Sequence, residues 1–502
     1  MKMRILSAVT SLLLLFALVP CIRSETVQDW TVPEGYNVND YNKAAAFLEQ
    51  ADENGVKNGE KLSESYDPND PETWGEYEDW DDELEDTALF PRFWWEETDG
   101  EKRLLSINAQ SCDLIGAASF SGCSHLAVLY LEYNRITSVD VSECAELQAL
   151  SLDWNEPLSD IDARGCSLLY YIGFNFCPLV TSVENLPGDS VGFLACCGSG
   201  LQELDLSDYH NLSGLSTTDS AQLTRIDVSG CEFLTVITCD NCNLSELILP
   251  DCKENLLSLR CMNNHLSHLE LGYTNMFDLS CPFNDLDSLD LTGMNSLQSL
   301  VCRYNRISEL DLTGLDQLTY LICSYNQLTS LDLSGCPNLV QLHSNNNLLT
   351  ELDLSGNPLL PVDRVYALNS GTVGLLFESY QDEYDSFTHA FVYAEGTANS
   401  DFLGWYNEAG DLISTDAEFD FSCIIGAETV LIARFSGSEA IPGDIDMSGA
   451  IEVADAIMAL RCTMGILELT PEQIEAGDMN ESGAIEVSDA IIILRTAMGL
   501  LG

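Results

Sequence analysis

The sequence predicts a mixed α/β chain organised around an elongated solenoid. Three observations predict it: a motif that recurs every 20 to 22 residues, apolar positions that alternate within each copy, and a duplicated segment near the C-terminal end. One copy reads LTYLICSYNQLTSLDLSGC from Leu318, and the copy before it reads LQSLVCRYNRISELDLTGL from Leu297. Such short units cannot bury their apolar side alone, and each completes the core of the next. The units begin at Leu126, Leu147, Leu169, Val191, Leu212, Leu234, Leu256, Met276, Leu297, Leu318 and Leu339.

The four units that begin at Leu256, Met276, Leu297 and Leu318 carry both the cysteine and the asparagine of the pattern L-x-x-L-x-C-x-x-N-x-L, and the other units carry part of it. The alternation predicts a short strand with inward leucines, and the asparagine predicts a turn whose backbone groups its side chain satisfies. The pattern resembles the leucine-rich repeat, and the strand cysteine is similar to the cysteine-bearing repeats of the internalin J type. This resemblance implies a leucine-rich repeat solenoid over residues 104–360. The turn asparagines are Asn134, Asn155, Asn264, Asn284, Asn305, Asn326 and Asn347.

Nineteen cysteines in an exported chain ordinarily indicate disulfides. The repeat register predicts instead that most of them stack as columns of reduced thiols inside the solenoid, where they act as small apolar groups. A disulfide network is the alternative. One column occupies the sixth position of the unit and contains Cys196, Cys239, Cys261, Cys281, Cys302 and Cys323. A second column lies at the end of the unit and contains Cys144, Cys166, Cys231, Cys252 and Cys336.

The formal charge of −61 and the pI near 4.1 argue against nucleic acid as a partner, because a polyanion is repelled. Residues 1–24 carry Lys2 and Arg4 ahead of an apolar run, which predicts a signal peptide and a secreted or cell-surface protein. Lipidation at Cys21 is an alternative that Pro20 disfavours. No later apolar run has the length of a membrane span.

Residues 25–103 form an acidic, tryptophan-rich region that we expect to cap the open end of the solenoid. Asp40 is the expected cap of a helix from about Tyr41 to Ala51. Residues 93–107 are expected to form two strands around a turn at Thr98, Asp99 and Gly100. The acidic run 76–86 is interpreted as a solvated loop, with calcium binding as the alternative.

The alternation that buries the leucines sends positions 3, 5 and 7 of each unit to the concave face, with position 8 at its edge. Aromatic residues recur on these columns, which favours recognition of a protein ligand, or else a glycan. The alternative is that the rings only shield the strand edges. The predicted contact residues are Tyr130, Tyr133, Trp154, Tyr171, Phe176, Phe283, Tyr304, Tyr320 and Tyr325.

Two apparent motifs are explained by the repeat. Cys239 and Cys242 form C-x-x-C, which alone indicates zinc or thiol exchange, but they occupy the strand-cysteine and turn-asparagine positions. His265 and His268 follow a turn and lack a third ligand. We therefore predict structural roles for all four residues.

The period ends near residue 360, and residues 361–437 contain β-type segments with Gly410 in a hairpin turn. The run Gly404, Trp405, Tyr406 resembles a small β-rich repeat domain that often follows leucine-rich arrays in bacterial surface proteins. Its expected role is that of a spacer and C-terminal cap. Residues 438–442 are expected to form a linker to a last module, 443–502.

That module holds the duplicated segments, DIDMSGAIEVADAIMALRCTMG from Asp444 and DMNESGAIEVSDAIIILRTAMG from Asp478. Calcium loops place oxygen ligands at positions 1, 3, 5, 7, 9 and 12, with glycine at 6. Gly449 and Gly483 occupy position 6. The first predicted set is Asp444, Asp446, Ser448, Ala450 (carbonyl), Glu452 and Asp455. The second is Asp478, Asn480, Ser482, Ala484 (carbonyl), Glu486 and Asp489.

Two such loop-helix segments resemble a type I dockerin, although serine at position 5 departs from the usual pattern. The resemblance implies two calcium ions and a partner, the cohesin module of a scaffoldin or cell-surface protein. An apolar helical stripe is expected at Ala456, Ile457, Leu460 and Met464 and at Ala490, Ile491, Leu494 and Met498. The implied cohesin-binding residues are Val453, Ala454, Leu460, Arg461, Val487, Ser488, Leu494 and Arg495.

Together these features predict a secreted, non-catalytic binding or adhesion protein. Its solenoid presents the recognition face, and its dockerin-like module attaches it to a scaffold. Outside the repeats no segment is large enough for a catalytic domain, and the carboxylates are too numerous to single out an acid and a base. The alternatives are a glycan-binding or polysaccharide-degradation component of a cellulosome-like complex, and a structural spacer.

Overall fold

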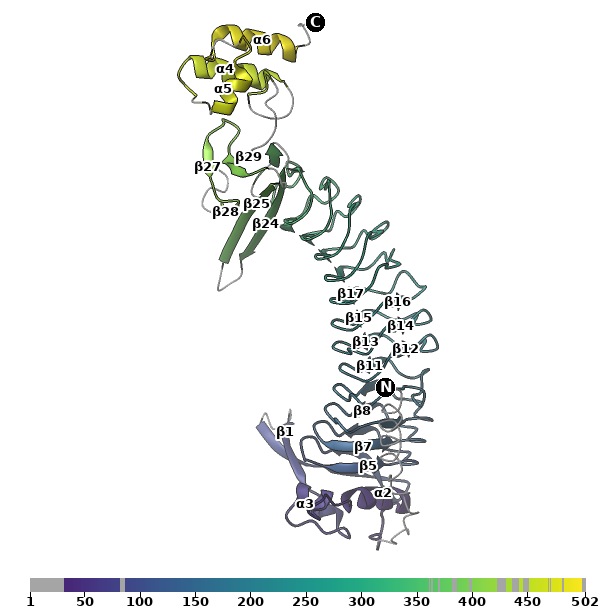
Figure 1. The fold of residues 1–502 in the computed structure, drawn as a ribbon. Helices are drawn as coiled ribbons and strands as arrows, with labels where there is room; N and C mark the ends of the chain where they lie inside the picture. Colours follow the sequence, from purple (N-terminus) through teal and green to yellow (C-terminus); the bar gives the residue numbers. More distant parts are fainter. Residues whose placement is uncertain are drawn as a thin grey trace, which may run out of the picture.

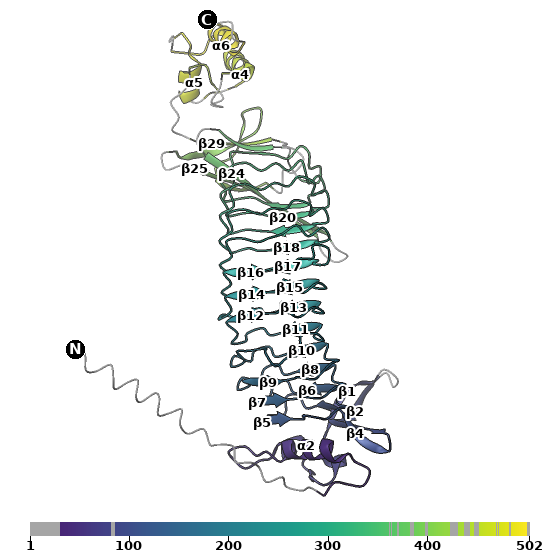
Figure 2. The ribbon, with the colours of Figure 1, turned by 90° about the vertical axis from the view of Figure 1, so that its right-hand side faces the viewer.

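The computed structural model describes residues 31–498 except 82–85, 361, 363, 369–370, 382–385, 397–399, 422–429, 436–441, 446–450, 468, 470 and 481–482. The predicted signal peptide and the expected linker therefore lie largely or wholly outside the described residues. The described chain forms a long curved solenoid with a capping region at its N-terminal end and a β-rich domain at the other (Figures 1 and 2).

The N-terminal cap contains α2 (Val38–Leu48), α3 (Asn58–Leu62), the 3-10 turn η1 (Pro71–Thr73) and the antiparallel pair β1 (Glu76–Asp81) and β2 (Asp86–Pro91). The helices α2 and α3 lie at the open end of the solenoid, and the β1–β2 pair projects to one side (Figure 1). The cap therefore keeps the core of the first turn from water, as solenoids require.

The beginning of α2 differs from the sequence prediction. The Asn37 side chain caps the helix by accepting hydrogen bonds from the backbone N–H groups of Asn39 and Asp40, at 3.1 and 3.2 Å. Asp40 is fully buried, and its carboxylate accepts from Arg103 Nε at 2.7 Å and from the Leu104 N–H at 3.2 Å. The prediction that Asp40 caps the helix was thus wrong, because Arg103 and Leu104 on β4 (Glu101–Asn108) bind its carboxylate.

The acidic run 76–86 is also not the loop that its charge suggested. Most of it forms β1, paired antiparallel with β2. The rings of Tyr77 and Phe90 face each other across the pair, with centroids 5.9 Å apart. Aromatic side chains favour strands, and this pairing outweighs the exposed charge.

The hairpin predicted for residues 93–107 is confirmed. β3 (Phe93–Thr98) pairs antiparallel with β4, and Asp99 and Gly100 take positive φ angles of 55° and 85° at the turn. β4 then pairs in parallel with the first repeat strand. The hairpin thus connects the cap to the sheet of the solenoid.

A sheet of 16 strands lines the inner side of the bend, where Figure 1 labels β8, β11, β13, β15 and β17. One short strand from each repeat enters it, and all the repeat strands are parallel. These strands are β6 (Val128–Tyr130), β8 (Ala149–Ser151), β10 (Tyr171–Gly173), β11 (Phe193–Ala195), β13 (Gly214–Ser216), β15 (Val236–Thr238), β17 (Ser258–Arg260), β18 (Asp278–Ser280), β19 (Ser299–Val301), β20 (Tyr320–Ile322) and β21 (Gln341–His343).

Two shorter parallel sheets form the outer side of the solenoid. Their strands come from the second apolar segment of the units, the part that reads LDLSG in later copies. One sheet contains β5 (Ile115–Ser119), β7 (Arg135–Asp140) and β9 (Asp160–Asp162), and the other contains β12 (Glu203–Asp205), β14 (Arg225–Asp227) and β16 (Glu246–Ile248).

Register places equivalent residues of successive repeats side by side. Leu300 pairs with Leu279 on one neighbour and with Leu321 on the other, and all three are fully buried. Because every strand repeats this register, each unit position forms a column along the solenoid. The predicted leucine core is confirmed.

The turn asparagines form one such column. Asn305 Nδ2 donates to the carbonyls of Cys302 at 3.0 Å and Cys281 at 3.1 Å, and its Oδ1 accepts from the Leu286 N–H at 3.0 Å. Each asparagine therefore joins its own repeat to the preceding one. Where asparagine is absent, Cys177, Ser199, Ser220 and Cys242 take its place. Of these, Cys177, Ser220 and Cys242 each donate to a carbonyl of the preceding repeat.

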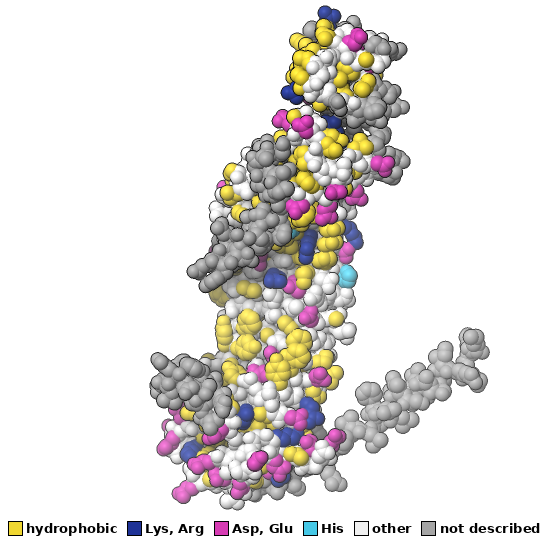
Figure 3. Space-filling model, turned by 90° about the vertical axis from the view of Figure 1, so that its left-hand side faces the viewer, with side chains coloured by type: hydrophobic (Ala, Val, Ile, Leu, Met, Phe, Trp, Pro, Cys, Tyr) yellow, Lys and Arg dark blue, Asp and Glu magenta, His cyan; other side chains and the backbone are white. Residues whose placement is uncertain are grey.

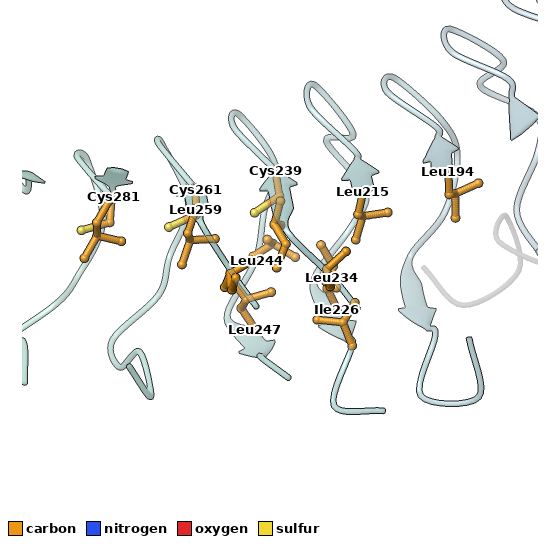
Figure 4. Packing of buried hydrophobic residues seen from close by; sticks show 14 of the residues in the cluster. Leu194, Leu215, Ile226, Leu234, Cys239, Leu244, Leu247, Leu259, Cys261 and Cys281 are labelled. Atoms are coloured by element: carbon orange, nitrogen blue, oxygen red, sulfur yellow. The ribbon is translucent and has the colours of Figure 1, made fainter. Parts of the chain in front are cut away.

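The sixth-position cysteines are fully buried and all are free thiols. Figure 4 shows Cys239, Cys261 and Cys281 on the same side of successive turns, beside the leucine column. None of the 17 cysteines among the described residues forms a disulfide. The sixth-position column predicted from the register is thus confirmed. In the second predicted column Cys144, Cys166, Cys231 and Cys336 are buried, whereas Cys252 is half-buried.

Buried thiols of this column should resist labelling. Burial raises the pKa of Cys302 to about 12 and raises the pKa of Cys239, Cys261 and Cys281 well above the ordinary thiol value. At pH 8 the column is therefore protonated and shielded from reagent. We expect alkylation, mapped by mass spectrometry, to modify the partly exposed Cys462 quickly and the column only after denaturation. Equal rates for Cys462 and Cys281 in the native protein would contradict the packing.

The last repeat passes into a β-rich domain that confirms the predicted strands. β24 (Gly371–Gln381) pairs antiparallel with β21 and extends the main sheet. Glycine at position 374 is required there, since a Cβ would lie 2.4 Å from the Asn345 Cα. Trp405 is fully buried within the domain. The remaining strands are β22 (Glu351–Asp353), β23 (Arg364–Leu368), β25 (Ser386–Gly396), β26 (Phe402–Tyr406), β27 (Leu412–Ser414), β28 (Glu418–Asp420) and β29 (Val430–Phe435).

The C-terminal module consists of α4 (Val453–Thr463), α5 (Pro471–Gly477) and α6 (Val487–Ala497). Its small core is made by Ile445, Ala456, Ala459, Ala490 and Ile493. Of the predicted stripe, Ala456 and Ala490 lie in this core. Ala459 and Ile493 pack the helices together, whereas the larger Leu460 and Leu494 remain exposed, because small residues allow α4 and α6 to approach closely.

Within the described part of the chain, no helix combines the length and the hydropathy that a membrane span needs.

Candidate functional site

The turn that ends each main-sheet strand holds the eighth residue of the unit in a left-handed conformation. Tyr133, Trp154, Phe176, Phe283, Tyr304 and Tyr325 all take φ angles between 55° and 58° there. In other units the same position is filled by Gly198, Asp219, Asn241, Asn263 or Asn346. A left-handed residue with a Cβ costs roughly 1–2 kcal/mol, and less for asparagine or aspartate. The aromatic residues therefore occupy a position at which glycine, asparagine or aspartate would adopt the left-handed conformation at a lower free-energy cost.

These six rings form two stacks. Stack A contains Tyr133, Trp154 and Phe176, with centroid distances of 5.8 and 4.1 Å between neighbours. Stack B contains Phe283, Tyr304 and Tyr325, with distances of 4.3 and 4.1 Å. Interplanar angles from 9° to 22° make the rings nearly parallel. Stacking of this kind contributes about 0.5–1.5 kcal/mol per pair, which offsets part of the backbone cost.

The stacks are open to solvent at their edges. Tyr133 is 56% exposed, Trp154 42% and Tyr325 41%. Within a stack each ring covers one face of its neighbour, and only the central rings, Trp154 and Tyr304, have a ring on both sides. Figure 3 looks onto the concave side and shows hydrophobic side chains gathered in patches along it. Exposed apolar patches that gather on one face are typical of a recognition site.

The other predicted aromatic residues are half-buried on the sheet itself. Tyr171 on β10 stacks on Phe193 on β11, with ring centroids 6.0 Å apart. The Phe193 ring covers Gly214, where a Cβ would lie 2.5 Å from the ring. Tyr130 and Tyr320 are also half-buried. Between the Tyr171 pair and stack A lie small residues, Ser151, Gly173, Ala195 and Ser216, which form a narrow floor.

Hydrogen bonds connect the position-7 residues Asp153, Asn175 and Cys197 of three successive units, and Cys197 also contacts Ser216 of the floor. Asp153 accepts from the N–H and the Nδ2 of Asn175, both at 2.8 Å. Asn175 Oδ1 accepts from the Cys197 N–H at 2.8 Å. Cys197 is half-buried, with its Sγ 3.1 Å from Ser216 Oγ. The face beside stack A is therefore a fixed hydrogen-bonded surface.

A depression of about 640 Å³ adjoins stack A at the strand edge. Tyr133 and Trp154 form its apolar wall, and Arg135 and Glu156 its polar rim. A side chain of a ligand can enter this depression between the aromatic wall and the charged rim. The sequence did not indicate it, because the rim residues lie beyond the repeat strands, Arg135 at the start of β7 and Glu156 in the connection after Trp154.

In the C-terminal module the structure describes eight of the twelve predicted calcium ligands. Residues 446–450 and 481–482 lie outside the described residues, and with them Asp446, Ser448, Ala450 and Ser482. The described ligands are Asp444, Glu452, Asp455, Asp478, Asn480, Ala484, Glu486 and Asp489. Among the described residues no three His, Cys, Asp or Glu side chains gather closely enough to hold a metal ion.

One described ligand nevertheless fits a cation. Asp489 is fully buried at position 12 of the second loop. Its Oδ2 accepts from the Glu486 N–H at 2.8 Å, but its Oδ1 is buried and has no hydrogen-bond partner among the described residues. A buried carboxylate oxygen left without a donor is costly unless a cation binds it. Asp455, its counterpart in the first loop, is equally buried and accepts from the Glu452 N–H at 2.7 Å.

All the predicted cohesin contacts are exposed on α4 and α6. Val453, Leu460, Val487 and Leu494 are between 37% and 53% exposed. Ala454, Arg461, Ser488 and Arg495 are exposed as well. Ile457 and Ile491, each 47% exposed, and Met464 and Met498 also lie at the surface; the sequence prediction had placed all four in the apolar stripe and none among the cohesin contacts. Equivalent apolar residues are thus exposed on both halves of the module.

No protein-family model and no curated protein matches this chain. Among solved structures, the functional domain of InlJ from Listeria monocytogenes, which includes a cysteine ladder, is 20% identical over 68% of this chain and 94% of that chain, with a TM-score of 0.41. InlF from the same organism is 19% identical over 51% and 72%, with a TM-score of 0.37. A leucine-rich repeat protein of Leptospira interrogans is 20% identical over 49% and 73%, with a TM-score of 0.39.

At these identities and scores no ligand or role passes from those proteins to this chain. The strands, the asparagine column and the buried leucines of the chain itself establish its architecture. The central part of the chain, from β4 to β21, is a leucine-rich repeat solenoid.

Proposed function

We propose that this protein is an exported, non-catalytic adhesion protein that binds a protein ligand on the concave face of its solenoid. The observation that carries the proposal is the pair of exposed aromatic stacks on one face, held in a backbone conformation that aromatic residues rarely adopt. Tyrosine and tryptophan give large contact areas with little loss of side-chain entropy, and they dominate the binding energy of many interfaces.

Removing one ring from each stack tests this function. We expect Trp154→Ala and Tyr304→Ala, made in the full chain, each to weaken ligand binding by tenfold or more, because truncating an interface anchor costs about 2 kcal/mol or more. Ligands are found by probing arrays of secreted proteins and of glycans with the purified protein. Phe233→Ala is the matched control, since Phe233 is 56% exposed but belongs to neither stack. Equal binding by Trp154→Ala, Tyr304→Ala and Phe233→Ala would refute the proposal.

The second part of the proposal concerns attachment. The C-terminal module acts as a type I dockerin, which binds two calcium ions and docks onto the cohesin module of a scaffoldin or cell-surface protein. Asp489 Oδ1, which is buried and has no hydrogen-bond partner in the described part of the chain, supports the cation site. The matching exposed residues of α4 and α6 support docking, because an apolar strip repeated on both halves offers the same surface twice.

Calcium binding is tested by isothermal titration of the full chain. We expect two specific ions per chain and loss of one in Asp489→Ala, since that change removes the position-12 ligand. Asp416→Ala, an exposed carboxylate in the β-rich domain, controls for weak binding to the acidic surface. Two undiminished specific ions in Asp489→Ala, or none in the wild type, would contradict the site.

A glycan ligand within a polysaccharide-degrading assembly is the second candidate, and the exposed rings are what favour it. Sugars usually pack on a free aromatic face, and inside both stacks those faces are covered by neighbouring rings. We therefore place it second. A glycan hit on the array that Trp154→Ala abolishes would reverse this order.

A further inference from the structure

Two charged side chains on the concave face each keep a polar atom without a partner. Glu132 Oε2 and Arg303 Nε are buried and form no hydrogen bond with any described residue. Both residues occupy position 7 of their units, one beside stack A and the other beside stack B. Their strands, β6 and β19, are eight strand spacings apart in the sheet. At about 4.8 Å per strand, the two groups lie about 38 Å apart along the face.

Arg303 differs from the other arginines of the repeats. Arg135, Arg164, Arg225, Arg260 and Arg306 each form an ion pair with a carboxylate. Arg303 forms none with any described side chain, although the chain carries 81 acidic residues against 20 basic ones. Its guanidinium lies over the Phe283 ring, 5.5 Å from the centroid. A guanidinium held on an aromatic face, with donors unused, is arranged to receive an anionic group.

Glu132 is the acidic counterpart. It is half-buried between strands, and burial raises the pKa of its carboxyl group, while a hydrogen bond from Ser151 acts in the opposite direction. The charge of Asp153 nearby raises the same pKa further. A cation bound at this site would offset both the desolvation of the Glu132 carboxylate and its repulsion by Asp153. The aromatic side chain of Tyr133 follows it directly in the chain and extends the contact surface.

The opposite signs of the two sites indicate the class of ligand. A polypeptide offers both lysine or arginine and carboxylates on one molecule, whereas a neutral glycan offers neither. Tyrosine, tryptophan and arginine, the residues that surround the two sites, are also the ones enriched among the energetic anchors of protein interfaces. Charge pairs at such distances fix the register of a partner along a groove.

We propose that the concave face binds a polypeptide at two anchors of opposite charge, a lysine or arginine side chain at Glu132 and a carboxylate at Arg303. The inference rests on the proposed protein-binding function and specifies its ligand. The partner carries a cationic and an anionic group about 38 Å apart. A folded surface meets this requirement, and so does an extended segment of about 12 residues.

Small charged probes test each anchor separately. Benzylammonium and benzoate are titrated into the full-length protein near physiological salt, with binding followed by saturation-transfer NMR. We expect Glu132→Gln to weaken benzylammonium about tenfold and leave benzoate unchanged, and Arg303→Gln to do the reverse. Glu143→Gln and Arg306→Gln, exposed residues away from positions 3, 5 and 7, should change neither. Circular dichroism verifies that the variants are folded.

Two outcomes would overturn the proposal. One is that Glu132→Gln and Arg303→Gln bind both probes like the wild type. The other is that glucuronate displaces benzoate from Arg303 while N-acetyl-glutamate amide does not, which would indicate an anionic glycan. Trp154→Ala and Tyr304→Ala test ligand binding by the concave face independently of these two anchors. If the charged anchors fail their test, the result for the aromatic stacks still stands by itself.

Discussion

Asn305→Ala is expected to destabilise the solenoid by about 3 kcal/mol or more. The change removes one side chain that makes hydrogen bonds with three backbone groups of two repeats, the carbonyls of Cys302 and Cys281 and the N–H of Leu286. Each buried backbone group left unsatisfied costs about 1–3 kcal/mol. Because each repeat contacts mainly its neighbours, the loss should be concentrated around β18 to β20.

Hydrogen exchange measured by mass spectrometry checks this expectation. Amides of β18, β19 and β20 should exchange faster in Asn305→Ala, while those of the N-terminal cap keep their wild-type rates. Asn295→Ala is the control, because Asn295 is exposed in the connection before β19. It should change stability by less than about 0.5 kcal/mol. Similar exchange in the two variants would argue that the asparagine column does not hold the repeats together.

Trp74→Ala should cost the N-terminal cap about 3–5 kcal/mol, as expected when a large buried aromatic is truncated. Trp74 is 1% exposed, and its ring contacts Tyr41 and Phe93 with centroid distances of 5.3 and 5.5 Å. Its Nε1 also donates to the Asp67 carbonyl at 3.0 Å. The cavity left behind would loosen α2 from the first turn of the solenoid.

Urea unfolding followed by far-ultraviolet circular dichroism, together with exchange in α2, measures the effect. Trp94→Ala is the matched control, because Trp94 lies on the adjacent strand β3 and is 43% exposed. We expect that control to lose less than about 1 kcal/mol. An equal loss in the two variants would mean that the cap does not depend on the buried ring.

The repeat made much of this architecture predictable. Once a unit of fixed length is recognised, register follows, and the pattern alone assigns Leu300, Cys302 and Asn305 to the core, the thiol column and the turn. The C-terminal helices were likewise predictable from their duplication. Errors arose where no repeat constrained the chain, as at Asp40 and in the acidic run 76–86.

The site was only partly predictable. Alternation identified the aromatic columns, but it could not show that the eighth-position rings stack with their faces covered, nor that Gly214 makes room for Phe193. Sequence also treats Arg303 and Arg306 alike. Only the structure shows that Arg306 is paired with Asp285, whereas Arg303 forms no ion pair with a described side chain.

By itself, the sequence determined which residues form each column of the solenoid, because a period of about 21 residues fixes the inward or outward direction of every strand position. Tertiary structure alone decided which side chains find partners, such as Asp40 with Arg103, and which described atoms remain without one, such as Glu132 Oε2 and Arg303 Nε. The physical reason is that pairing depends on distances between segments far apart in the chain, and local pattern carries no information about them.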